Sequence, residues 1–468
     1  MKAQLNSVLF TSVVCSFTIV EPVFAKAESV PNRVLVKFKN SQTLGQSLKS
    51  LAQFRSMHQQ DDSLRVLGHL QELNTFEHGL SVLRFSSNLE ALQAAKSLRI
   101  NSLVEFAQPD YMFRIFPLYS VRSEQNKSLF SRINFLKLYD EPVTPIASDP
   151  ALPEIPELPS PPVTDPDLAQ AWGLSKIEAI STWTEQSGSR KIVVADIDTG
   201  TDYTHPDLVN NLWSNPNPTN GDEIGYDFAN KDPWPFDDQG HGTHTAGTIG
   251  ATGANGIGIS GVSPAVSIMT LKFISKEGFG TTSDAIASID YAIANGARVM
   301  SNSWGGESDQ GEEDKALTEA VERAEAADIL FVAAAGNDGT DNDTRPMIPA
   351  AIKRANVLTV ASSTNRDTRS FFSNFGKETV HVAAPGSNVY STIPGGKYAQ
   401  FSGTSMACPH VAGLAALILA ERPELSAVQV KEIIMATVDP LQAFSGKIVT
   451  GGRVNARAAL LKARNYSF

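Results

Sequence analysis

The sequence predicts an α/β protein, with a mostly parallel sheet that has helices on both faces and a small α+β domain before it. Two observations carry this prediction. From about Asp165 onward, short apolar runs that suit strands alternate with longer segments of helical spacing, which is typical of parallel sheets with crossover helices. Before that point, a shorter series of strand and helix patterns is separated from the rest by a proline-rich stretch.

Composition narrows the class of protein further. The chain has 468 residues, enough for two or three domains, of which 42% are hydrophobic and 19% charged. A formal net charge of -11 argues against a nucleic-acid partner and favours divalent cations. The cysteines are Cys15 and Cys408. Because Cys15 lies in a predicted leader, we expect no intramolecular disulfide in the mature chain.

Residues 1–27 have the pattern of a signal peptide. Lys2 is the basic end, Val8–Val20 is mostly apolar, and the stretch 25–27 has the small-x-small pattern of a cleavage site. An uncleaved membrane anchor is the alternative, but the apolar run is short for a span of about 20 residues. The sequence therefore predicts export, to the extracellular space or the periplasm, with no stable membrane anchor.

Residues 28–114 are predicted to form the small domain, and residues 115–164 a linker. Strand patterns cover residues 34–38, 80–85 and 103–111, and a helical pattern covers 89–98. The linker is dense in proline, so we expect it to be extended, exposed and open to proteolysis.

Residues 165–468 are predicted to form the sheet domain. Its predicted strands are 191–197, 266–272, 298–302, 329–333, 357–361 and 379–383, and its predicted helices are 241–251, 283–295, 314–327, 405–420 and 428–436. In such sheets, functional side chains collect at the carboxyl ends of the strands.

Two polar residues stand at such positions. Asp198 ends a buried strand and precedes Thr199 and Gly200, where it either caps the turn or fixes an imidazole. His241 opens a helix after an acidic loop. Metal binding by His241 and His244 is the alternative, but the segment lacks the glutamate of a zinc protease motif.

Ser405 lies in the glycine-hinged turn 403–413, which runs into a helix that is apolar on every face. We expect Pro409 in the first turn of this helix. A serine there is either a cap or a nucleophile beside free helix N–H groups. A serine nucleophile needs a histidine to take its proton and a carboxylate to orient that histidine. Asn337 ends another buried strand, where its amide either suits a turn or donates to a developing oxyanion.

Together these motifs resemble the subtilisin-like serine proteases. The segments Asp-Thr-Gly, His-Gly-Thr-His, Ala-Ala-Gly-Asn and Gly-Thr-Ser-Met-Ala-x-Pro-His occur in the order of that family, over about residues 165–460. The resemblance implies that Asp198 orients His241, that His241 is the general base and then the general acid, and that Ser405 attacks the substrate. It also implies that Asn337 completes the oxyanion hole.

The resemblance also implies substrate and calcium sites. The residues that it assigns to substrate binding are Ser303, Trp304, Gly305, Ala335 and Gly336, and those that it assigns to calcium are Asp165, Asp207, Gly253, Asn255, Ile257 and Ile259. Mixed carboxylate, amide and carbonyl oxygens suit calcium better than zinc. Pairing of main chains implies extended polypeptide substrates. Plain core packing is the alternative for Trp304.

By the same resemblance, residues 28–114 are a propeptide that assists folding of the enzyme, inhibits it with its tail in the cleft as a substrate-like strand, and is removed by it. The expected protein is a secreted, self-processing serine endopeptidase, monomeric, with polypeptides and its own propeptide as partners. An inactive relative that only binds is the competing possibility. Two residues remain unassigned: Asp196 stands where relatives usually have an apolar residue, and Cys408 is expected to be a small buried side chain.

Overall fold

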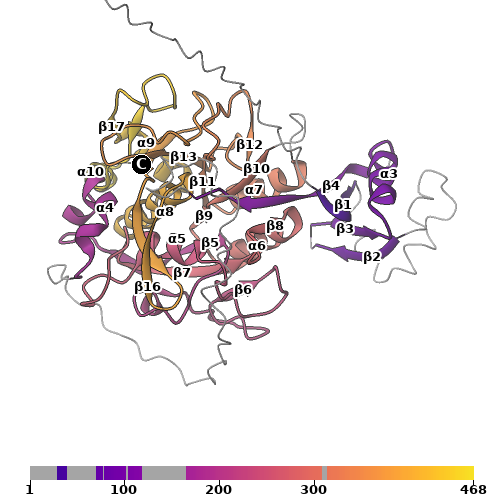
Figure 1. Ribbon diagram of the computed structural model, residues 1–468, viewed down its shortest axis with the longest axis horizontal. Helices are drawn as coiled ribbons and strands as arrows, with labels where there is room; N and C mark the ends of the chain where they lie inside the picture. The colour runs from indigo at the N-terminus through magenta and orange to yellow at the C-terminus, as the bar shows by residue number, and fades with distance from the viewer. Residues whose placement is uncertain are drawn as a thin grey trace, which may run out of the picture.

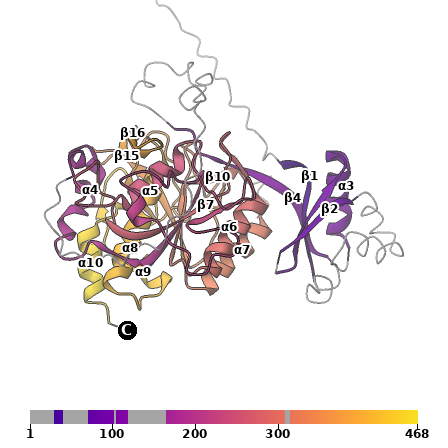
Figure 2. The same ribbon diagram turned by 90° about the horizontal axis from the view of Figure 1, so that it is seen from below.

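The computed structural model describes residues 29–39, 70–76, 78–101, 104–118, 165–307 and 314–467. The predicted signal peptide and most of the predicted linker lie outside these residues. The described chain forms a large α/β body and a small domain beside it, and Figures 1 and 2 both show strand β4 running from the small domain into the body.

The body is built on a nine-stranded sheet in the order β17-β18-β14-β13-β11-β9-β5-β7-β6. Its strands are β5 (Gly188–Asp198), β6 (Gly225–Asp227), β7 (Ala265–Lys272), β9 (Val299–Asn302), β11 (Leu330–Ala334), β13 (Val357–Ser363), β14 (Val382–Pro385), β17 (Asp439–Pro440) and β18 (Gly452–Arg453). Every neighbouring pair is parallel except β17 and β18. The predicted α/β class is therefore confirmed. The last predicted strand, 379–383, is wrong in its bounds, because β14 begins only at Val382.

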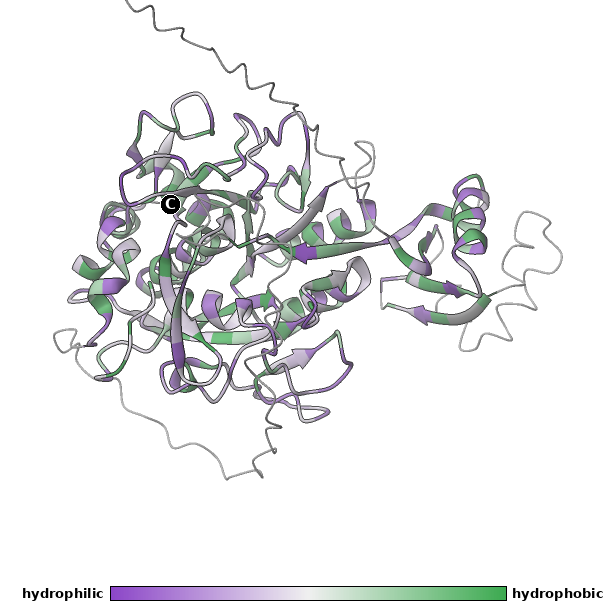
Figure 3. Ribbon diagram, viewed as in Figure 1, coloured by the Kyte–Doolittle hydropathy of each residue, from purple (hydrophilic) through white to green (hydrophobic). Residues whose placement is uncertain are grey.

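Helices cover both faces of this sheet. They are α4 (Trp172–Lys176), α5 (His241–Gly250), α6 (Thr282–Ala294), α7 (Lys315–Ala326), α8 (Thr404–Glu421), α9 (Ala427–Ala436) and α10 (Ala456–Arg464), with short 3-10 turns η5 (Leu168–Gln170), η6 (Ile180–Thr182) and η7 (Val209–Asn211). One packed pair is α5 with α8, and another is α6 with α7. Apolar side chains of the strands and of these helices form one continuous core. Figure 3 colours the ribbon by the hydropathy of each residue.

Helix α8 is the centre of the core. It contacts five strands of the large sheet, and its residues from Thr404 to Leu419 are buried. Among the described residues it is the one helix long and apolar enough to cross a membrane, and 89% of it is buried in the fold. The expectation for Pro409 is wrong: the helix begins at Thr404, so Pro409 lies beyond its first turn. The missing N–H leaves the Ser405 carbonyl without its usual helical donor, and the Ser303 hydroxyl donates to that carbonyl instead, at 3.0 Å.

The small domain is an α+β unit that docks on the body. It consists of β1 (Ser29–Phe38), β2 (Leu70–Thr75), β3 (Leu80–Phe85), α3 (Asn88–Arg99) and β4 (Val104–Ile115). Two of its side chains meet the starts of body helices. Asp110 accepts from the Ser283 N–H at 3.0 Å and from its hydroxyl at 2.8 Å, and Gln108 accepts from the Ala316 N–H at 3.3 Å. These contacts satisfy free N–H groups in the first turns of α6 and α7.

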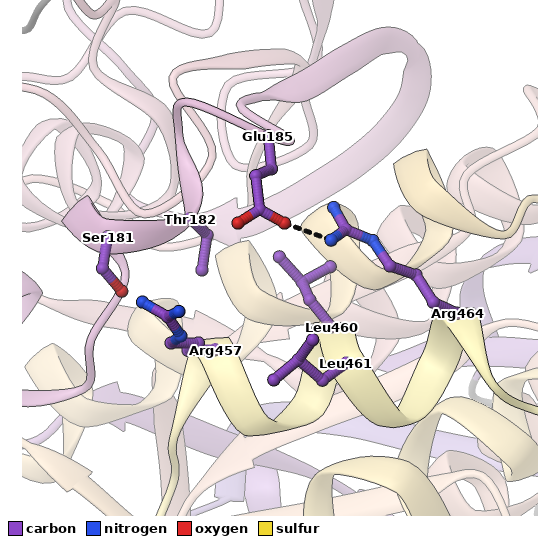
Figure 4. A pocket seen from close by; sticks show the side chains of 7 residues that line it. All are labelled: Ser181, Thr182, Glu185, Arg457, Leu460, Leu461 and Arg464. Atoms are coloured by element: carbon purple, nitrogen blue, oxygen red, sulfur yellow. Dashed lines mark hydrogen bonds and ion pairs between the residues drawn. The ribbon is translucent and has the colours of Figure 1, made fainter.

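Short strands complete the body around these elements. They are β8 (Phe279–Thr281), β10 (Trp304–Glu307), β12 (Met347–Ile348), β15 (Val389–Ile393) and β16 (Lys397–Phe401). A small hollow between η6 and α10, lined by both polar and apolar side chains, is shown in Figure 4. Arg464 of α10 forms an ion pair with Glu185 at this hollow, and a second ion pair with Glu421 at the end of α8.

Candidate active site

Asp198 and His241 meet at the carboxyl edge of the large sheet. Asp198 is the last residue of β5, and His241 is the first residue of α5. The Nδ1 atom of His241 lies 2.7 Å from Oδ1 of Asp198, and both side chains are almost fully buried. The same Oδ1 accepts from the Thr199 N–H at 2.7 Å, which fixes the carboxylate. Such a bond selects one tautomer of the imidazole and leaves Nε2 for proton transfer.

A second buried aspartate, Asp237, accepts hydrogen bonds from the backbone at the start of α5. Asp237 accepts from the N–H groups of Gln239, Gly240 and Thr243, at 2.7–3.0 Å. Gly240 has a φ of 104°, a left-handed conformation that a side chain would strain. Asp237 and this glycine turn therefore set the direction in which His241 leaves the loop.

Ser405 is the second residue of α8 and is fully buried. Its hydroxyl donates to the Ser303 carbonyl at 3.0 Å. Within the described part of the chain, Nε2 of His241 is buried without a hydrogen-bond partner. The structure therefore joins Asp198 to His241, whereas the Ser405 hydroxyl is bonded to Ser303 and not to the imidazole.

Asn337 lies beside the start of α8, and its amide is held in one orientation. Its Oδ1 accepts from the N–H and from the hydroxyl of Thr404, both at 2.8 Å. The side-chain NH₂ is thereby turned the other way, where it donates to the carbonyl of Pro117 at 3.0 Å. An oriented NH₂ next to the first N–H groups of a helix is the arrangement that stabilises an oxyanion.

Residues 112–117, which we call the cleft strand, run between β8 and β10 and end at the Asn337 amide. The end of β4 pairs antiparallel with β8 on one side, where Phe113 faces Gly280, and with β10 on the other, where Arg114 faces Gly305 and Ile115 faces Trp304. The predicted boundary between the small domain and the linker lies at residue 114, but β4 continues to Ile115 and pairs with strands of the body. The resemblance predicts that the propeptide tail lies in the cleft, but no pattern in residues 112–117 shows that the tail extends this far, because its position depends on pairing with a distant edge.

The predicted substrate residues differ in how they meet the cleft strand. Trp304 is fully buried and packs on Phe113 with ring centroids 5.2 Å apart. A Cβ at Gly305 would lie 2.7 Å from the Phe116 ring, so this glycine makes room for that ring. Ser303 bonds Ser405 as described above. Ala335 and Gly336 precede Asn337, and their backbone bonds lie within the body: Ala335 N–H to Val360, and Gly336 N–H to Thr404.

The remaining histidines of the region are structural. Burial lowers the pKa of His244 to about 3, and its Nε2 lies 3.0 Å from the Val389 carbonyl. Burial also lowers the pKa of His410 to about 4. Across the described residues, no group of three or more His, Cys, Asp or Glu side chains is placed to share a metal ion. Burial raises the pKa of the Cys408 thiol to about 12, so this cysteine is unreactive.

The residues predicted for calcium meet around the loop 253–260. Asp165 accepts from the N–H groups of residues 254–256, at 3.0–3.2 Å, and from the Ser260 hydroxyl at 2.6 Å. Asp207 accepts from the Asn255 amide at 2.6 Å, from the Ile259 N–H and from the Tyr398 hydroxyl. Both carboxylates are buried, and neither forms a salt bridge with a described residue. Gly253 and Ile257 lie in the same loop.

Comparison with known proteins identifies the class to which this site belongs. The model of the subtilase family matches residues 189–457. Thermitase from Thermoactinomyces vulgaris is 38% identical over 62% of this chain and 96% of its own length. A thermophilic serine proteinase from Bacillus sp. (strain AK1) is 31% identical over 93% of this chain and 88% of its own length.

A further relative is subtilisin-like protease 2 of Plasmodium falciparum (isolate 3D7), which is 35% identical over 62% of this chain; the chain spans only 22% of the length of that protein. The family match and the near-complete coverage of thermitase agree with the buried aspartate–histidine pair and the oriented amide. The chain therefore belongs to the subtilase family and is a serine endopeptidase.

Proposed function

We propose that this protein is a secreted endopeptidase made as a self-inhibited, self-processing zymogen, which cleaves extended polypeptides through an acyl-enzyme on Ser405. The observation that carries the proposal is the cleft strand, which brings a backbone carbonyl of the same chain to the Asn337 amide. Export rests on the sequence of residues 1–27 alone.

In the proposed reaction, His241 takes the proton of the Ser405 hydroxyl as the hydroxyl attacks the substrate carbonyl. Asp198 stabilises the imidazolium that forms, and His241 then gives its proton to the leaving amine. The negative oxygen is stabilised by the Asn337 amide and by the Ser405 N–H. The hydroxyl must first leave the Ser303 carbonyl, which is a rotation about one side-chain bond.

Substrates are proposed to bind as the cleft strand does. An extended peptide lying between β8 and β10 gains main-chain hydrogen bonds on both edges, and these bonds do not depend on sequence. Selectivity then comes from the aromatic surface of Trp304 and from the space beside Gly305, which hold Phe113 and Phe116. We propose apolar and aromatic preferences at the two corresponding positions.

The cleft strand suits an inhibitor better than a substrate. Phe116 lies at Gly305, yet the carbonyl at the Asn337 amide belongs to the next residue, Pro117. That carbonyl belongs to the Pro117–Leu118 bond, whereas the preceding Phe116–Pro117 bond is an X-Pro bond, whose nitrogen has no N–H and carries a bulky ring. We propose that the Phe116–Pro117 bond stays intact and that maturation cuts the chain beyond it. The contacts of Gln108 and Asp110 with α7 and α6 hold the inhibitor in place.

Calcium is proposed as a structural ion at the loop 253–260. Burial raises the pKa of Asp207, and a bound cation would offset the cost of its buried charge. The donor set fits a hard cation: the carboxylate of Asp207, the amide oxygen of Asn255, and carbonyls of Gly253, Ile257 and Ile259. Asp165 is the sixth proposed ligand, although its oxygens already accept four hydrogen bonds. When bound, calcium would supply structural rigidity only.

The other proposed properties follow from charge and sequence. We propose a monomer with no nucleic-acid partner, in keeping with the net charge of -11. An inactive relative that only binds peptides is the competing function, and no observation favours it over the enzyme, since the aspartate–histidine pair and the oriented amide have no use in binding alone.

Replacing Asn337 with alanine should lower kcat by about 10²–10³, the range found for the equivalent amide in related subtilisins, with a smaller effect on KM. The amide stabilises the charge that develops in the transition state and not in the bound substrate, so kcat should change more than KM. Steady-state kinetics of the mature enzyme on a chromogenic peptide would measure it. The exposed Asn465→Ala variant should behave as wild type, and a loss below about threefold at Asn337 would contradict the proposed oxyanion role.

Ser405→Ala should be exported with its N-terminal domain attached, because self-processing needs the nucleophile. Intact-mass spectrometry of the exported protein should show a shortened wild type, a shortened Ser445→Ala control and an untrimmed Ser405→Ala. If Ser405→Ala appeared at the wild-type length, another protease would be responsible and self-processing would be refuted.

Chelation of calcium should lower the melting temperature of the Ser405→Ala chain, in which autolysis is blocked. A ligand present at about 100 times its Kd stabilises by about 2.7 kcal/mol, which corresponds to a shift of several degrees. Differential scanning calorimetry with calcium and with EDTA measures the shift. The Asp207→Asn variant should show no such difference. Equal melting temperatures with and without EDTA in the parent would rule out the site.

A further inference from the structure

Asp196 is a buried acid that the proposed reaction does not use. It lies on β5 two residues before Asp198, so both side chains point to the same face of the strand. Only 2% of its surface is exposed, and it forms no salt bridge with any described residue. Its Oδ1 has no hydrogen-bond partner in the described ranges. A buried charge in this position would be costly, so the protonation state of Asp196 needs an explanation.

The contacts of Thr245 suit a protonated Asp196. Its hydroxyl oxygen lies 2.8 Å from Oδ2 of Asp196 and 2.9 Å from the carbonyl oxygen of Gly242. A hydroxyl has one proton and can donate to only one of these oxygens, whereas a carbonyl can only accept. If Thr245 donates to Gly242, the proton in the second contact must come from Asp196.

We propose that Asp196 is a neutral carboxylic acid that donates to Thr245, and that it is thereby a positioning residue for the catalytic pair. The chain of bonds runs from β5 through Asp196 and Thr245 to the Gly242 carbonyl, in the first turn of α5. Gly242 follows His241, and Asp198 ends the same β5 strand. The chain therefore ties together the two elements that hold the aspartate and the histidine.

The surroundings of Asp196 favour its protonated form. Burial raises the pKa of Asp196 well above its ordinary value, and the Asp198 carboxylate raises it further, while the Thr245 and Ser301 hydroxyls lower it because they can donate to the ionised form. The titratable groups on the elements packed around it are Asp198 on β5, Asp237 before α5, His241 on α5, Lys272 on β7 and Cys408 on α8. Lys272 is bound to Asp238 and to carbonyl oxygens, and is not paired with Asp196.

A protonated Asp196 predicts in which direction the stability of the folded chain changes with pH. Because the pKa of Asp196 is higher in the folded chain than in the unfolded chain, the folded chain holds more protons between those two pKa values. The contribution of Asp196 to stability is therefore complete at low pH and is lost as the pH rises toward the folded pKa. Asparagine cannot ionise, so the Asp196→Asn variant should not lose this stability as the pH rises.

The experiment measures melting temperatures of Ser405→Ala and of Ser405→Ala with Asp196→Asn, from about pH 5 to about pH 8. The melting temperature of the double variant, taken relative to that of its parent, should increase steadily as the pH rises. The substitution can also add a constant difference between the two, which does not depend on pH. A matched control is Asp343→Asn in the same background. Hydrogen bonds from Thr379 and from N–H groups hold the pKa of Asp343 low, so its offset should not change over this range. An offset for Asp196→Asn that is equally flat would show that the acid is ionised and overturn the proposal.

The positioning role has its own readout in mature enzymes that retain Ser405. The positioning role rests on the proposed function, because it assumes that Asp198 and His241 are catalytic; the protonation state of Asp196 does not depend on it. Asp196→Asn keeps an N–H that donates to Thr245, whereas Asp196→Val keeps the shape without the donor. We expect the kcat of the valine variant to fall about tenfold, with the asparagine variant at least about fivefold faster than it. Equal kcat values for the two variants would refute the positioning role, whereas loss of all activity in the parent would refute the proposed function instead.

Discussion

The hydrogen bond between Asp198 and His241 is the interaction on which the site depends. It joins the end of β5 to the start of α5, two segments that meet only when the parallel sheet is formed. Water is excluded from it, so its electrostatic strength is greater than at a surface. Asp237 and the glycine turn at 240 orient His241, and the site lies against the apolar core around α8.

A second constraint comes from Pro409, whose missing N–H leaves the Ser405 carbonyl open. Ser303 then both donates to Ser405 and accepts from it, which ties the nucleophile to the strand edge that bears Trp304 and Gly305. The same edge pairs with the cleft strand. Ser303 thus links Ser405 to the same piece of backbone that pairs with the cleft strand.

Much of this organisation could be predicted from the sequence, because apolar periodicity is local. It predicts β5, β7, β9 and the helices α5 and α8 to within a few residues, and it predicts which polar residues follow them. It does not predict β8 or β10, since three or four residues become a strand there only through pairing with residues 112–115. The helical position of Pro409 was also missed, because its compensating donor, Ser303, is distant in the chain. The predicted roles of the leader and of most of the linker lie outside the described residues.

Asp198, His241 and Ser405 are expected to act as one unit once the cleft strand has left. Covalent labelling of the mature enzyme by a fluorophosphonate, located by peptide mass spectrometry, measures whether they do. We expect a label on Ser405 in the wild type and a labelling rate lower by on the order of 10³ or more in His241→Ala. A label on another residue, or a rate at Ser405 that does not depend on His241, would contradict this expectation.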